Sequence, residues 1–97
     1  DIAAMRMMAE LAGRLGRYRD AEALLRRALE LAPGFRPARS NLATVLHRQN
    51  RSDEALIELD RLLAEEPDNP THANLKAAAS ARLGEFDEAI ALYETVL

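Results

Sequence analysis

Apolar residues recur along the chain three and four positions apart, in six segments separated by short polar breaks. In the first segment, Met5, Met8, Leu11 and Leu15 follow this spacing. Such a pattern places the apolar groups on one side of an α-helix. The sequence therefore predicts six helices, over residues 3–15, 18–31, 37–49, 52–66, 69–83 and 86–97.

The breaks between these segments are typical of helix ends. Pro37 and Pro70 fall where the first turn of a helix tolerates proline, because the N–H group there has no intrahelical partner. Asn69 is predicted to cap the fifth helix, and Ser52 and Asp53 to cap the fourth. Because the breaks are short, we expect consecutive helices to form antiparallel pairs.

The pattern repeats along the chain at a fixed interval. Ala21, Ala55 and Ala89 are evenly spaced, and Pro33 and Pro67 keep the same spacing. Self-similarity at a fixed period of this length is typical of stacked helical repeats. We therefore expect an all-α fold of three stacked helical hairpins, with each alanine where the two helices of a hairpin cross. The repeats cover about residues 2–35, 36–69 and 70–97.

Three segments carry a family resemblance: LGRYRDAEALLRRALELAP, QNRSDEALIELDRLLAEEP and LGEFDEAIALYETVL superimpose without gaps. They resemble the tetratricopeptide repeat, a helix–turn–helix unit of about 34 residues. The resemblance implies a right-handed superhelix and a single domain. The signature positions are a small residue, a large residue four further on and a closing proline. They match Ala21, Leu25 and Pro33, then Ala55, Leu59 and Pro67, then Ala89 and Tyr93.

The third repeat departs from the family pattern at Lys76, where an apolar residue is expected. Two interpretations are open. Its alkyl stem packs while the ammonium group reaches solvent, or it forms an ion pair with a glutamate of a neighbouring helix. The bulky aromatic residue typical of each first helix is also missing, and its places hold Met5, Arg39 and Ala73.

Composition excludes several function classes. The 97 residues include no cysteine, which excludes disulfides, thiol catalysis and thiolate metal sites. A net charge of −3 and only 4% aromatic residues argue against nucleic-acid binding. No stretch is long and apolar enough to cross a membrane, and we expect a cytoplasmic location.

The two histidines, His47 and His72, have no partner at helical spacing and make a poor metal site. We expect both at the surface. The sequence thus predicts a domain that is not itself catalytic and that uses no metal or cofactor.

In the tetratricopeptide family, the first helices of successive repeats line a concave groove that receives peptides. The resemblance therefore implies a protein or peptide partner. The matching positions are Arg6, Glu10, Arg14, Ser40, Asn41, Thr44, His47, Arg48, Asn74, Ala78 and Arg82, together with Ala3, Gly13, Pro37, Thr71 and Ala81.

Within this set, Arg14, Arg48 and Arg82 occupy the same place in every repeat. Stacked helices would set them in a row spaced about 10 Å apart. The row either serves solubility or binds an extended acidic segment, because guanidinium groups pair well with carboxylates.

The repeats that clamp the carboxylate tail of chaperones are matched only in part. Arg6 and Asn41 fit their pattern, but Glu10 stands where the first asparagine belongs, and Thr71 and Leu75 replace the two later bases. We therefore do not expect a chaperone-tail clamp.

A narrower resemblance covers residues 46–70 and 74–97, which look like the N-terminal repeats of bacterial tetratricopeptide-containing sulfotransferases. It implies that the chain is a structural or substrate-presenting arm of a larger enzyme. The chain opens with Asp1 rather than methionine, and we expect it to be a fragment of a longer protein. The last predicted helix leaves Leu92, Val96 and Leu97 uncovered, which predicts self-association through the C-terminal face.

Overall fold

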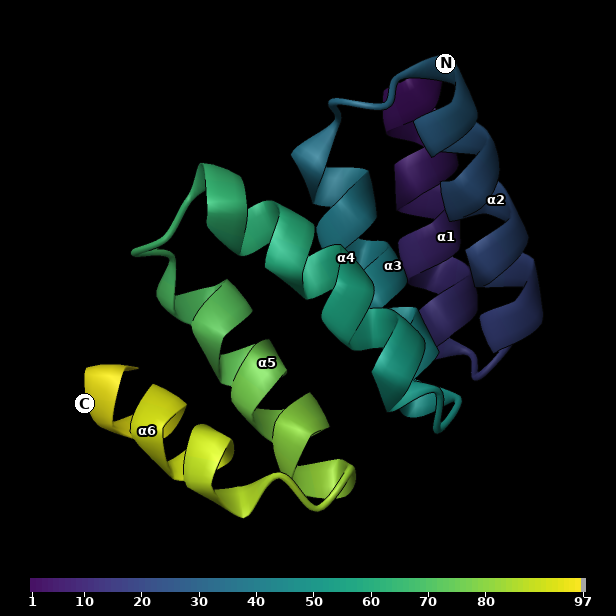
Figure 1. Cartoon of the computed structure of the whole chain (residues 1–97). Coiled ribbons are helices and arrows are strands. Elements are labelled where there is room, and N and C mark those ends of the chain that lie inside the picture. Colours follow the sequence, from purple (N-terminus) through teal and green to yellow (C-terminus); the bar gives the residue numbers. More distant parts are fainter. Residues whose placement is uncertain (97) are drawn as a thin grey trace.

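The computed structural model describes residues 1–96, with side chains as far as residue 94. It confirms the predicted all-α fold (Figure 1). The six helices are α1 (Ile2–Arg14), α2 (Tyr18–Leu31), α3 (Arg36–Arg48), α4 (Ser52–Glu65), α5 (Pro70–Arg82) and α6 (Phe86–Val96).

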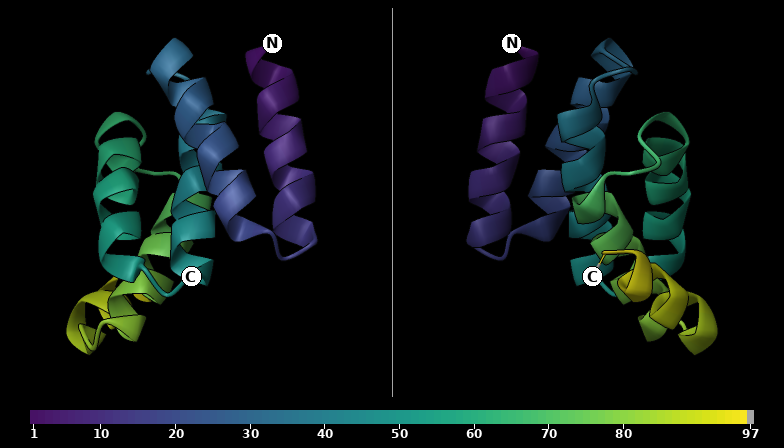
Figure 2. Two further views of the ribbon diagram at one scale, coloured as in Figure 1. Left: turned by 90° about the vertical axis from the view of Figure 1, so that its right-hand side faces the viewer. Right: turned by 90° about the vertical axis from the view of Figure 1, so that its left-hand side faces the viewer.

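The helices form three antiparallel hairpins, α1 with α2, α3 with α4 and α5 with α6. The hairpins stack because α2 packs on α3 and α4 packs on α5. The first helices α1, α3 and α5 also touch in succession, and the two side views show the stack turning as it advances (Figure 2). The result is a short right-handed superhelix with extents of 39 × 26 × 19 Å.

Small residues allow the close approach of paired helices. Ala21 and Ala55 are fully buried and Ala89 is 3% exposed. One turn later, Leu25 and Leu59 fill the space between a hairpin and the next one, and both are buried. A larger side chain at an alanine position would force the helices apart, because the surrounding core is already close-packed.

The turn inside each hairpin requires a left-handed residue. Gly16, Asn50 and Gly84 have φ values of 77°, 66° and 84°. Glycine adopts this conformation without steric cost, and asparagine tolerates it better than most residues. The regular spacing of these three residues therefore reflects one turn geometry used three times.

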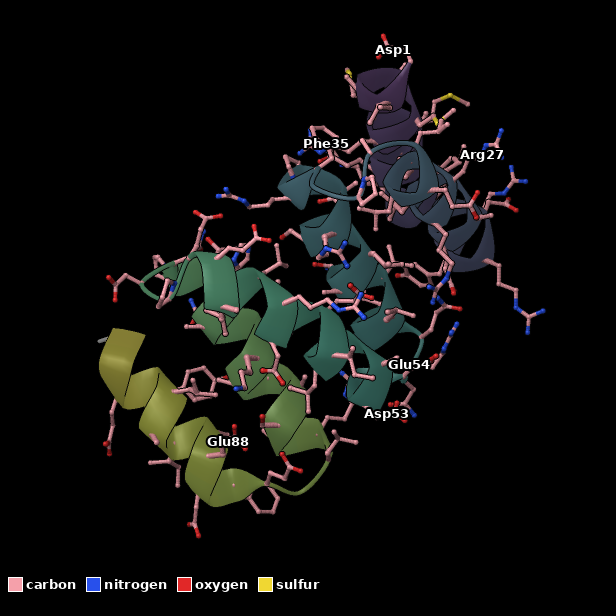
Figure 3. The ribbon with its side chains drawn as sticks, turned by 45° about the horizontal axis from the view of Figure 1, so that its top comes forward. Asp1, Arg27, Phe35, Asp53, Glu54 and Glu88 are labelled. Carbon is pink, nitrogen blue, oxygen red and sulfur yellow. The ribbon has the colours of Figure 1, made fainter. Side chains whose placement is uncertain are left out.

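The cap predicted for α5 is confirmed, because Asn69 Oδ1 accepts hydrogen bonds from the backbone N–H groups of Thr71 and His72 at 3.0 and 3.2 Å. The caps predicted for α4 are wrong. Arg51 occupies the N-cap position, without a side-chain hydrogen bond to the helix. Asp53 lies in the first turn of α4 (Figure 3). Ser52 is buried, and its hydroxyl instead contacts His47 Nδ1 at 2.9 Å.

Lys76 follows the second of the two interpretations. Its Nζ atom lies 2.9 Å from Asp60 Oδ1 on α4 and 3.4 Å from Glu88 Oε1 on α6. The hydrogen bond with Asp60 raises the pKa of Lys76. The ion pair with a neighbouring glutamate is therefore confirmed, and an aspartate from the preceding hairpin joins it.

Candidate functional site

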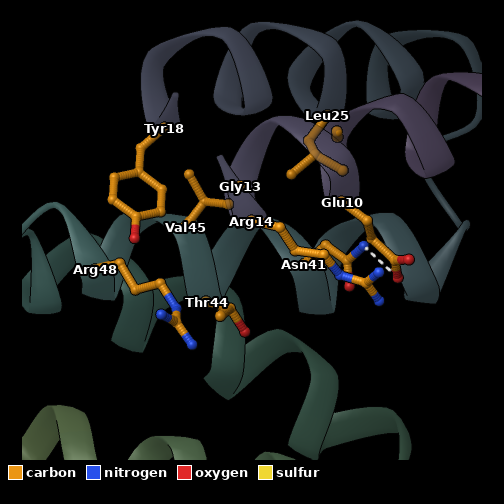
Figure 4. A pocket seen from close by; sticks show the side chains of 10 residues that line it. Glu10, Gly13, Arg14, Tyr18, Leu25, Asn41, Thr44, Val45 and Arg48 are labelled. Carbon is orange, nitrogen blue, oxygen red and sulfur yellow. Dashed lines mark hydrogen bonds between the residues drawn. The ribbon is translucent and has the colours of Figure 1, made fainter. Parts of the chain in front are cut away.

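A pocket of about 340 Å³ lies between the first two hairpins, where α1 faces α3 (Figure 4). Six of the predicted groove residues line it. They are Glu10, Gly13 and Arg14 from α1 and Asn41, Thr44 and Arg48 from α3.

The inner surface of the pocket is apolar. Ala9, Leu25 and Val45 line it and are 1%, 0% and 6% exposed. These three side chains belong to the core that joins α1, α2 and α3. The pocket is therefore a concavity in the packed interface of two repeats, with rigid walls.

One end of the pocket carries a closed polar network. Arg6 Nη2 pairs with Glu10 Oε1 at 2.9 Å. Asn41 Nδ2 donates a hydrogen bond to the same oxygen at 3.3 Å (Figure 4). The charge of Glu10 is therefore balanced within the protein. Glu10 fixes the Asn41 side chain in place across the α1–α3 junction.

The pocket also carries positive charges that no acidic side chain neutralises. Arg14 and Arg48 are exposed, and neither forms an ion pair or hydrogen bond with another side chain of the part that the structure describes. Guanidinium groups in this state are available for a carboxylate, with which they form bidentate bonds. The Arg48 side chain and the Tyr18 hydroxyl lie on the same side of the pocket (Figure 4).

The third arginine of the predicted row is engaged. Arg82 Nη1 donates a hydrogen bond of 2.6 Å to the backbone oxygen of His47. His47 lies in the last turn of α3, where a cation is favoured by the helix dipole. Arg82 therefore ties α5 to α3, and it does not line the pocket that Arg14 and Arg48 share.

The remaining predicted groove residues are dispersed. Ser40 lines a second hollow with Pro37 and Thr71, at the beginnings of α3 and α5. Asn74 is exposed and Ala78 is half-buried, and neither lines a described pocket.

Tyr18 is a pocket residue that was not among the predicted groove residues. It lines the pocket from the first turn of α2. The signal for it was its position, since Tyr18 follows the tight turn that ends the helix carrying Arg14.

Both histidines differ from the expected surface position. His72 is 5% exposed, and His47 is half-buried beside Ser52. Burial, together with the positive charges of Arg82 and Arg48, lowers the pKa of His47. His72 holds the place in the third repeat that the fully buried Ala38 holds in the second, so the repeat register already indicated burial.

The described residues were also searched for metal sites and for membrane-spanning helices. Among residues 1–96 no group of three or more His, Asp or Glu side chains is placed to hold a metal ion. None of the six described helices is long and apolar enough to span a bilayer.

Comparison with known proteins gives a consistent result. The tetratricopeptide repeat matches the chain over residues 14–79 and, in a second form, over residues 71–97. A search of curated protein sequences gives no significant match.

Several solved structures share the fold. MamA from Desulfovibrio magneticus RS-1 has a TM-score of 0.91 over 99% of this chain at 21% identity. The first tetratricopeptide domain of Spaghetti (RPAP3), described as bound to the HSP90 peptide SRMEEVD, has a TM-score of 0.92 over 99% of this chain at 19% identity. A tetratricopeptide repeat protein from Parabacteroides merdae has a TM-score of 0.89 over 99% of this chain at 26% identity.

The chain spans 54% of the MamA structure, 76% of the RPAP3 domain and 39% of the Parabacteroides protein. At these identities the structures show a shared fold. The sequence match over residues 14–79 covers more than half of the 97 residues, and the chain therefore belongs to the tetratricopeptide repeat family.

Proposed function

We propose that the chain is a protein-interaction module that binds an extended acidic segment of a partner protein along the α1–α3 groove. The observation that carries this proposal is the pair of unpartnered arginines, Arg14 and Arg48, on one pocket between two repeats. Two carboxylates of such a segment would neutralise the two guanidinium groups that the described chain leaves free. The domain itself is non-catalytic in this proposal.

A relative of the same fold supports the ligand class. The peptide in the RPAP3 complex, SRMEEVD, carries three acidic residues and one basic residue. We do not extend that ligand's identity to this chain, because Glu10, Thr71 and Leu75 depart from the chaperone-tail clamp. What carries over is the binding of an acidic peptide by a domain of this fold.

The test is a titration of the chain with a fluorescein-labelled acidic peptide, followed by anisotropy. Arg14→Ala combined with Arg48→Ala should weaken binding by tenfold or more, and added salt should weaken the wild type further, because partly exposed charge pairs are screened. Arg19→Ala combined with Arg27→Ala, two exposed positions of α2, is the matched control for loss of two positive charges. Affinity that survives the double substitution would contradict the proposal.

The alternative role, an arm of a larger enzyme such as a sulfotransferase, rests on the sequence of residues 46–70 and 74–97 alone. It predicts a phosphosulfate-binding catalytic domain in the full-length protein. The sequence of the complete gene tests this prediction directly.

A further inference from the structure

The α5–α6 hairpin is joined to the rest of the stack by small and polar side chains. Three places on the first helix of a repeat carry large buried apolar side chains in the second repeat, and smaller or polar ones in the third. They hold Leu42, Val45 and Leu46 in α3, and Lys76, Ala79 and Ser80 in α5. The only large apolar side chain within α5 is Leu75, which is half-buried against a cluster formed by Ala43 of α3 and two leucines of α4. α5 therefore brings less apolar surface to its neighbours than α3 does.

Two buried polar groups of α5 lack hydrogen bonds. Ser80 is fully buried, and its Oγ atom has no hydrogen-bond partner among the described residues. His72 is 5% exposed, and no described residue forms a hydrogen bond with its Nδ1 atom. Both groups could bond to water if α5 unfolded. Each of them therefore favours unfolding of this helix over its packed state.

The polar contacts between the third hairpin and the second are exposed to solvent. Lys76 pairs with Asp60 of α4, whose side chain is 59% exposed, and the bond from Arg82 to the His47 backbone oxygen is exposed as well. The junction of the first and second hairpins differs. Its central carboxylate, Glu22, is only 14% exposed and accepts hydrogen bonds from two side chains of the second hairpin. Exposed ion pairs contribute little to stability, so the polar contacts do not compensate for the small apolar contact of α5.

The weakness belongs to the third hairpin and not to end position in the stack. The first hairpin also has a neighbour on one side only, yet one buried cluster runs from Ala9 of α1 through Leu25 of α2 to Leu46 of α3 and Ala55 of α4. Among the described residues, none of α5 or α6 belongs to this cluster. Since a stack of repeats is held by contacts between neighbours, the boundary between α4 and α5 is the weakest one.

We propose that α5 and α6 unfold together while α1–α4 stay folded, and that the folded hairpin is a removable cover over the apolar surface of Leu59 and Leu62. These two side chains of α4 are each 1% exposed. In the third repeat, which no further hairpin covers in the structure, the place of Leu59 is taken by Tyr93, and Tyr93 is 42% exposed. Unfolding of α5 should therefore expose Leu59 to a similar degree.

This conformational change is separate from the acidic groove. Every residue that lines the pocket between α1 and α3 belongs to α1, α2 or α3, which stay folded when the third hairpin opens. An acidic peptide should therefore bind whether the third hairpin is folded or not. Either proposal can fail while the other holds.

The first test is hydrogen exchange of the 97-residue chain under native conditions and at low protein concentration, followed by mass spectrometry. Amides of α5 and α6 should be at least tenfold less protected than the slowest amides of α3 and α4. They should also share one opening equilibrium with a weak dependence on denaturant, because only part of the surface is exposed in that opening. Equal protection of the slowest amides in all six helices would overturn the proposal, as would low protection confined to α6.

Two leucine substitutions provide the second test. Leu24 of α2 and Leu75 of α5 are both half-buried, and Leu24 packs on the cluster shared by the first two hairpins. Leu24→Ala should speed exchange of the slow amides of α1–α4 about tenfold and leave α5 and α6 unchanged, because its contacts persist when the third hairpin opens. Leu75→Ala should speed exchange in every helix, because its contacts are lost in the opening and in complete unfolding alike. Equal acceleration of all helices by Leu24→Ala would mean that the chain unfolds only as a whole, which would overturn the proposal. Circular dichroism of each variant checks that the helices are retained.

Discussion

Arg82 is bonded to the backbone oxygen of His47 at 2.6 Å, so the end of α5 is tied to the end of α3. The equivalent residues Arg14 and Arg48 have no partner among the described side chains. Three arginines in one repeat register therefore differ in role. Two are available to a ligand, and the third joins adjacent repeats.

This difference predicts opposite effects of removing each arginine. Arg82→Ala should lower the free energy of unfolding by about 1 kcal/mol or less, since the bond is charge-assisted but exposed, and should change peptide affinity little. Arg48→Ala should weaken peptide binding and should change the free energy of unfolding little. Urea unfolding and peptide anisotropy on both variants measure this, and a loss of affinity in Arg82→Ala equal to that in Arg48→Ala would contradict the assignment.

The helix crossing at Ala55 should not tolerate a larger side chain. Ala55 is fully buried, so Ala55→Leu must displace α3 or α4 and should cost about 1–3 kcal/mol of stability. Ala64→Leu, at an exposed place on the same helix, is the control and should have little effect. An unchanged melting temperature for Ala55→Leu would show that the crossing has spare volume.

Lys76 should be replaceable by leucine. It holds the place in the third repeat that Leu42, which is 1% exposed, holds in the second, and its partners Asp60 and Glu88 stay 59% and 49% exposed. Those carboxylates would remain hydrated without it, so Lys76→Leu should be neutral or stabilising by up to about 1 kcal/mol. Lys76→Ala should instead destabilise, because the stem is lost. Denaturant unfolding compares the two, and a large loss in Lys76→Leu would mean that the ion pairs dominate.

Glu22 should make stability depend on acid. Burial would raise its pKa, but hydrogen bonds from Gln49, Arg26 and Arg51 outweigh burial and lower it from 4.5 to about 2. Since the folded value lies below the unfolded one, the stabilisation is complete above pH 4.5 and is lost as the pH falls towards 2. Glu22→Gln should lose about 1–2 kcal/mol at neutral pH, and the gap to wild type should close in acid. Unfolding measured at several pH values tests this, and a gap that stays constant would argue against it.

The repeat period made most of the fold predictable. Ala21 and Ala55 are small because helices cross there, and the same requirement places a small residue at this position in every repeat. The cap at Asn69 was also predictable, because its chemistry depends only on its neighbours in sequence. Ser52 has the same chemistry, yet its hydroxyl contacts His47. A contact between helices decided its role, and such contacts cannot be predicted from the neighbouring residues in the sequence.

The candidate site was predictable in part for a related reason. The repeat register placed Arg14 and Arg48 on one face, and both line one pocket. The register could not show that Arg82 reaches a backbone oxygen, because long side chains choose among many rotamers according to nearby acceptors. The apolar wall of the pocket was likewise hidden, since the helical spacing of Val45 indicates packing and nothing more.

The exposed surface of α6 leads to the last prediction, self-association. Tyr93 holds the place of Leu25 and Leu59, which are buried between a hairpin and the next one, yet it is 42% exposed. At the other end of the stack, Met8 and Leu11 are 57% and 59% exposed, although α3 buries the equivalent positions. Both surfaces thus carry apolar residues at the positions that pack neighbouring repeats together inside the stack. Val96 and Leu97, which the sequence predicts to take part, have side chains outside the described residues.

The 97-residue chain should therefore associate end to end, with α6 of one copy on α1 of another. Such a contact does not close on itself and should give a size that grows with concentration. Ile90→Glu with Tyr93→Glu should shift the chain to monomer, because both residues are exposed and would place charge in the contact. Ala91→Glu is the control, since the equivalent Ala23 and Ile57 are exposed inside the stack. Sedimentation velocity over a range of concentrations decides the matter, and a wild type that stays monomeric at high concentration would refute the prediction.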